Sequence, residues 1–166
     1  VVSDTRIAEA PIAQAIALAD AFDAHFDVLS LGVDRTQTGY YYAGANAMVL
    51  QESLGRAHDE AAEADAFVRN LLGASGVRWG ADTGVAQLAD LGRHVAARAR
   101  FSDLVILPQP YGKDRGAELE PILEAALFDG AAAVLVVPGG TAAMSPAPSR
   151  VVSGWNESAE ALSAIR

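Results

Sequence analysis

The chain of 166 residues contains no cysteine, and aromatic residues make up only 7% of it. Without cysteine it has no disulfide, no thiol nucleophile and no thiolate ligand for a metal. Its longest apolar runs, such as residues 131–138, are far shorter than the ~20 residues of a membrane-spanning helix. No signal peptide is visible either. These absences predict a cytoplasmic protein with no membrane partner.

Positive charge is also scarce. The 12 Lys and Arg residues stand against 21 Asp and Glu residues, which gives a net charge of -9. Proteins that bind nucleic acid need a basic surface, so no nucleic-acid partner is expected. A single nucleotide remains compatible with this charge, because a few backbone amides are enough to hold it. The apolar content of 51% excludes disorder, and the length fits one α/β domain.

The motifs of the common catalytic and cofactor sites are missing as well. No serine lies in a G-x-S-x-G nucleophile elbow, and there is no G-x-G-x-x-G dinucleotide fingerprint. The acidic run that begins at His58 has no second histidine four residues away, so we interpret it as a solvated helix face. No catalytic residue and no metal ligand is therefore predicted.

The apolar residues of the chain alternate between strand-like runs and helix-like spacing. Strands alternating with helices, with nearly continuous apolar strands, are typical of a parallel sheet covered on both faces. The predicted strands are residues 1–3, 26–33, 77–79, 103–108 and 132–138, and the predicted helices are residues 8–25, 45–72, 84–100 and 118–128.

A parallel sheet of this kind binds ligands beyond the carboxyl ends of its strands, where the strand order reverses. The residues that follow the predicted strands there are Asp4, Asp34, Gln109, Gly112 and Gly116. They form the candidate nucleotide site of the sequence.

Three consecutive tyrosines, residues 40–42, follow the second predicted strand. Aromatic rings on such a loop either stack on a planar ligand or cover a partner surface. Alternatively, they pack on the helix that follows them in the sequence. The sequence leaves both interpretations open.

The end of the chain repeats the pattern of its beginning. Residues 150–153 read Arg-Val-Val-Ser and precede a helical segment, as residues 1–3 do, and residues 139–149 are rich in Gly, Ala, Pro and Ser. A repeat of this length is typical of tandem domains, because solenoid units are much shorter. We therefore predict one domain over residues 1–138, a linker over 139–149 and the first strand and helix of a second similar domain over 150–166. The sequence is expected to be a piece of a longer protein.

The chain resembles the universal stress protein domain of the tandem bacterial type. The resemblance rests on Asp4 after strand 1, the strand FDVLSLGV, the long second helix, the strands DLVILP and AAVLVVP, and the restart VVSGWNESAEAL. It implies a doubly wound, five-stranded parallel sheet in the order 3-2-1-4-5. This fold is of the Rossmann-like, adenine nucleotide alpha hydrolase-like class.

Members that bind ATP carry a G-x2-G-x9-G-[S/T] loop after strand 4, which the resemblance places at Gln109. Here three residues instead of two separate Gly112 from Gly116, and no Gly-Ser or Gly-Thr pair follows. Carboxylates that would repel a triphosphate crowd the loop, and two cations offset part of their charge. The carboxylates belong to Asp114, Glu118, Glu120 and Glu124, and the cations to Lys113 and Arg115. ATP is therefore not the expected cofactor.

The apolar strand over residues 132–138 is expected at an edge of the sheet, where an uncovered strand invites pairing. The resemblance implies that the same strand of another copy, or of the second tandem domain, covers it, so a homodimer is predicted. The expected function is a non-enzymatic, dimeric binding and interaction module in a stress response. The alternative is an ATP-binding member with weak or no hydrolysis. A more distant alternative is an electron-transfer or nucleotidyl-transfer domain.

Overall fold

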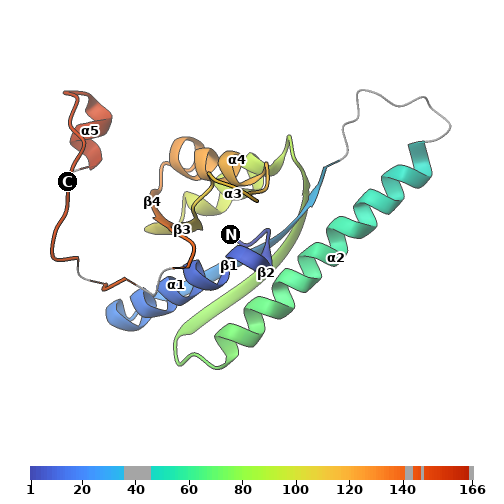
Figure 1. Ribbon diagram of the computed structural model, residues 1–166, viewed down its shortest axis with the longest axis horizontal. Coiled ribbons are helices and arrows are strands. Elements are labelled where there is room, and N and C mark those ends of the chain that lie inside the picture. The colour runs from blue at the N-terminus through green and yellow to red at the C-terminus, as the bar shows by residue number, and fades with distance from the viewer. Residues whose placement is uncertain (36–45, 141–143, 147, 165–166) are drawn as a thin grey trace.

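The computed structural model describes residues 1–35, 46–140, 144–146 and 148–164 (Figure 1). The tyrosines at positions 40–42 lie outside these residues. In chain order the elements are η1 (Thr5–Ile7), α1 (Glu9–Phe22), β1 (His25–Asp34), α2 (Asn46–Gly73), β2 (Arg78–Gln87), α3 (Leu91–Ala99), β3 (Leu104–Pro108), α4 (Leu119–Glu124), the π-helical turn η2 (Ala125–Asp129), β4 (Ala133–Val137) and α5 (Ala159–Ala164).

All strand pairs are parallel, and the strands form two small sheets. In the first sheet β1 pairs with β2 in a register that runs from His25 beside Arg78 to Asp34 beside Gln87. In the second sheet β3 pairs with β4, from Leu104 beside Ala133 onward. The predicted α/β class with parallel strands is therefore confirmed.

The predicted single sheet of five strands in the order 3-2-1-4-5 is wrong. Of the expected first strand only Val2 pairs, as an isolated bridge to β1: its amide donates to the Leu29 carbonyl and its carbonyl accepts from the Leu31 amide, both at 2.8 Å. The chain then turns into η1, because Asp4 caps that turn by accepting a hydrogen bond from the Arg6 amide. A single paired residue forms no ladder that could join β1 to β3.

The strand predicted at 77–79 and the helix predicted at 84–100 are also wrong in their bounds. The strand β2 continues to Gln87, and α3 begins only at Leu91. Val85, Leu88 and Leu91 have helical spacing, but Val85 lies in β2 and pairs with β1 in the parallel ladder. Tertiary pairing thus overrides a local pattern that fits both structures.

A core shared by both sheets holds them together. On one side of β1, Leu29, Leu31 and Val33 pack with residues of α3, β3, α4 and η2. On its other side, Val28 packs with residues of α1 and with Ala64, Val68 and Leu72 of α2. Figure 1 shows α2 lying along β1 and β2, with α3 and α4 on the opposite side. The alternation of side chains along β1 therefore supplies two hydrophobic layers.

The residues after the linker stand apart from this core. Val151 and Val152 are 77% and 96% exposed and belong to no strand, and Figure 1 shows α5 away from the main body. A strand needs a neighbour, and no described residue pairs with them. The second domain over residues 150–166 stays a prediction. Among the helices that the structure describes, none is both long and apolar enough to cross a membrane.

The closest approach of α2 to the sheet depends on a glycine. A Cβ atom on Gly32 would stand 2.7 Å from the carbonyl carbon of Ala57 and closer still to its oxygen. Both groups are backbone, so they cannot rotate away. We expect Gly32→Ala to lower the free energy of unfolding in urea by about 3 kcal/mol, at the upper end of overpacking effects.

Gly55 on α2 is the matched control, since a Cβ there meets nothing within 4 Å. Because alanine is the better helix former, Gly55→Ala should raise the free energy of unfolding by up to about 1 kcal/mol. Equal effects of the two substitutions would contradict this packing of α2 on β1.

Candidate functional site

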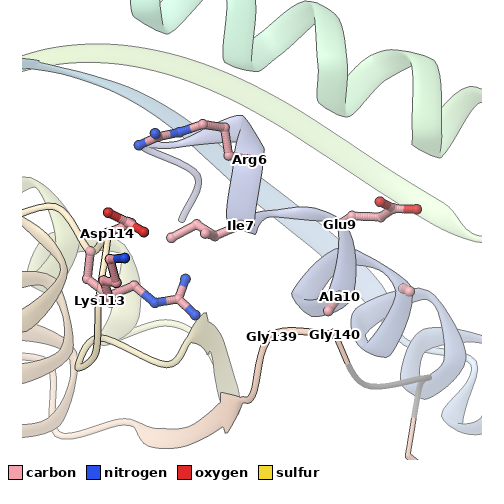
Figure 2. Close-up of a pocket in the computed structure, with 10 residues that line it drawn as sticks. Arg6, Ile7, Glu9, Ala10, Lys113, Asp114, Gly139 and Gly140 are labelled. Carbon is pink, nitrogen blue, oxygen red and sulfur yellow. The ribbon is translucent and has the colours of Figure 1, made fainter.

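A cleft of about 700 Å³ opens beyond the carboxyl ends of the paired Val2, of β3 and of β4. It is lined by Arg6, Ile7, Glu9, Ala10, Ala13, Lys113, Asp114, Arg115, Gly139 and Gly140. Figure 2 shows Lys113 and Asp114 facing Ile7, with Gly139 and Gly140 near Ala10. The cleft thus lies between the start of α1, the loop after β3 and the first residues after β4.

None of the five predicted site residues lines this cleft, although neighbours of Asp4, Gly112 and Gly116 in the chain do. Sequence reasoning missed the contributions of Arg6 and of the residues after β4. For the residues after β4, the pair Gly139-Gly140 behind an apolar strand was a usable signal.

The carboxylate of Asp4 is hydrogen-bonded to Arg6. Its Oδ1 accepts from the Arg6 amide at 2.9 Å and from Nε at 3.0 Å, and its Oδ2 accepts from Nη2 at 2.7 Å. The side-chain hydrogen bond to Arg6 holds the pKa of Asp4 below its usual value; the backbone hydrogen bond and the charge of nearby Arg115 lower the pKa further. Asp4 is therefore ionised at neutral pH and fixes the turn that enters α1.

Asp34 ends β1 and is only 1% exposed. Its Oδ1 accepts a hydrogen bond of 2.6 Å from the Ser53 hydroxyl on α2. This hydrogen bond connects the end of β1 to α2 and gives Asp34 a role in the packing of the fold. Asp34 does not line the cleft.

Arg35 joins three segments of the chain next to Asp34. Its Nη1 donates to the Glu60 carboxylate at 2.9 and 3.0 Å and to the Val33 carbonyl at 3.2 Å. Its Nη2 donates to Glu118 Oε1 at 3.1 Å. Partial burial opposes the charge, but the hydrogen bond to Glu60 and the charge of Glu118 outweigh it and raise the pKa of Arg35. Arg35 is thus a permanent cation between two carboxylates.

The Glu118 carboxylate lies against Gly116. Glu118 is 2% exposed, and a Cβ atom on Gly116 would stand 2.6 Å from its Cδ. The open side of Gly116, where the backbone would have to meet a phosphate, is therefore filled by an anion of the chain itself. Among the described residues, the cation that holds this anion is Arg35.

Gln109 and Gly112 have structural explanations of their own. The Gln109 amide donates to the Val137 carbonyl at 3.0 Å and so extends the ladder between β3 and β4. Gly112 has a φ of 126°, which side chains other than glycine rarely adopt, and a Cβ there would meet nothing within 4 Å. The glycine is therefore explained by the backbone conformation of the turn and not by close packing where its side chain would lie.

The cleft itself carries more cations than anions. Arg6, Lys113 and Arg115 line it together with Glu9 and Asp114. Arg6 is paired with Asp4, whereas Lys113 and Arg115 form no ion pair with a described residue. Arg115 lies close to the linker backbone, because a Cβ on Gly139 would stand 3.1 Å from its Nη2. Two unpaired cations beside glycine backbone are suited to one small anion, such as a carboxylate or a single phosphate.

The described residues contain no group of three or more His, Asp or Glu side chains that could hold a metal ion. His58 is exposed on α2, and its Nδ1 lies 2.8 Å from the Leu54 carbonyl of the preceding turn. This contact fits the expected solvated helix face.

No protein-family model, no curated protein and no solved structure matches the chain. The structure defines an α/β domain with a cleft beyond the carboxyl ends of its parallel strands. The resemblance to universal stress proteins stays a prediction.

Proposed function

We propose that this chain is a universal-stress-protein-like domain of a stress response. It acts as a non-enzymatic, dimeric binding and interaction module and lacks the ATP phosphate loop of the family it resembles. The observation that carries the proposal is the Glu118 carboxylate, which is buried against Gly116 and held by Arg35.

A phosphate that approached Gly116 would meet this carboxylate at close range. Two like charges 4 Å apart repel each other by about 4 kcal/mol at the dielectric constant typical near a protein surface. To make room, Glu118 would have to leave Arg35, and the cost of exposing the pair adds to the repulsion. A polyphosphate is therefore excluded by a group that the fold already contains.

The alternative is an ATP-binding member with weak or no hydrolysis. Lys113 and Arg115 favour it, because both line the cleft without an ion pair to a described residue. They offset only the charges of Glu9 and Asp114 on the same cleft, and this leaves no surplus positive charge from the pair for a triphosphate. We therefore assign the cleft to one small anion and not to a nucleotide triphosphate.

A thermal-shift measurement with millimolar MgATP separates the two functions. Ligand that binds the folded state raises stability by mass action, so we expect the wild-type melting temperature to move by less than about 1 °C. No inorganic phosphate should be released from ATP above the buffer background. A rise of several degrees would establish the nucleotide-binding alternative.

Glu118→Ala and Glu120→Ala form a matched pair for the same assay. Glu118 is buried against Gly116, whereas Glu120 is exposed on the first turn of the same helix. Removing the buried carboxylate frees Arg35 for another anion, so MgATP should raise the melting temperature of Glu118→Ala by ~2–4 °C. Glu120→Ala should behave as the wild type. The same response from both variants would show that Glu118 does not block the loop.

The proposed dimer interface is the outer edge of β4. Among the described residues β4 pairs only with β3, which leaves its other edge without a strand. Apolar side chains are exposed on this sheet and in the turn before β4: Val136 on β4 is 36% exposed, Leu104 on β3 41% and Phe128 76%. An uncovered apolar edge favours pairing with the same edge of a second copy about a twofold axis.

A lysine on β4 should prevent this pairing. We expect the wild type to sediment as a dimer at micromolar concentration and Val136→Lys as a monomer, because an edge charge would be buried in the paired sheet. Met48→Lys is the control, since Met48 is an 82% exposed apolar residue on α2, outside the proposed interface. A wild-type monomer, or equal effects of both variants, would contradict the interface.

A further inference from the structure

Gln14 is the buried polar residue of α1 and is only 1% exposed. A buried amide without hydrogen-bond partners costs about 1–3 kcal/mol of stability. The groups that bind the Gln14 amide therefore identify the segment that packs on this face of α1. Ala10, one turn earlier on the same face, lines the cleft.

Both polar atoms of Gln14 bind one residue of the linker. Its Nε2 donates to the Met144 carbonyl at 3.2 Å, and its Oε1 accepts from the Met144 amide at 2.5 Å. A side-chain amide carries the same donor and acceptor as a peptide group, so it can pair with the backbone of one residue at two points. This pairing recognises the backbone of Met144 and not its side chain.

The same linker begins at the cleft. Gly139 and Gly140 line it beside Ala10 and Ala13, and Gly140 has a φ of 74°, a conformation that suits glycine. The linker is thus in place at two points of α1, the cleft wall and Gln14.

We propose that Gln14 is a backbone clasp for the linker. It pins Met144 to α1, and this anchor keeps Gly139 and Gly140 in position as a wall of the cleft. A displacement of the linker that breaks the hydrogen bonds between Gln14 and Met144 would also displace Gly139 and Gly140 from the cleft. The conformation of the chain after the linker is thereby coupled to the shape of the ligand site. The inference goes beyond the proposed function, because it holds whatever anion the cleft takes.

Hydrogen exchange followed by NMR on the full chain tests the clasp. In the wild type the Met144 amide should exchange at least about tenfold more slowly than an unbonded amide of the same sequence, since it donates one hydrogen bond and its carbonyl accepts another. Exchange at the rate of an unstructured chain would overturn the proposal by itself, without any variant.

Gln14→Met keeps the length of the side chain but removes both hydrogen bonds, and Gln51→Met makes the same change at an exposed position of α2. We expect Gln14→Met to speed Met144 exchange by about tenfold. It should also shift the amide resonances of Gly139 and Gly140, while β1 amides keep their protection. Gln51→Met should change none of these. If Gln14→Met leaves Met144 exchange and both glycine resonances at their wild-type values, Gln14 is no clasp.

Discussion

We propose that the ion pair between Arg35 and the buried carboxylate of Glu118 keeps a polyphosphate away from the carboxyl ends of the strands. One guanidinium, at the end of β1, also holds Glu60 on α2, so a single cation joins β1, α2 and the start of α4. Losing one partner of such a pair leaves an uncompensated buried charge, which commonly costs about 3–5 kcal/mol, and less where the cation is partly exposed, as Arg35 is. Because the carboxylate lies against Gly116, the position that suits a phosphate is filled by the fold itself.

The remaining cleft follows from this arrangement. With Glu118 engaged by Arg35 and Asp4 engaged by Arg6, the cations of the cleft that form no ion pair with a described residue are those of the loop after β3. They face the start of the linker, which Met144 anchors to α1 through Gln14. The site is therefore built from segments far apart in the sequence, and the shared core of the two sheets sets their relative positions.

Much of the fold was predictable because local pattern and tertiary structure agree there. The helices predicted over 8–25 and 45–72 and the strands over 26–33, 103–108 and 132–138 are confirmed to within a few residues. The extent of β2 was not predictable, since Val85 fits both a helical and a strand pattern and only β1 decides between them. The site was harder still: the sequence indicated Lys113 and Arg115 only as a partial offset to the loop carboxylates. Arg6 and Gly139 join them in the cleft through packing that no local spacing encodes.

A double-mutant cycle on Arg35→Met and Glu118→Gln, measured as free energies of unfolding in urea, tests this account most directly. Both replacements keep side-chain size while removing charge, so the coupling energy isolates the interaction between the two groups. We predict a favourable coupling of at least about 1 kcal/mol, within the range of charged hydrogen bonds after allowance for the exposure of Arg35. Additive effects, with a coupling below about 0.3 kcal/mol, would mean that Glu118 is not held at Gly116 and that the loop is open to phosphate.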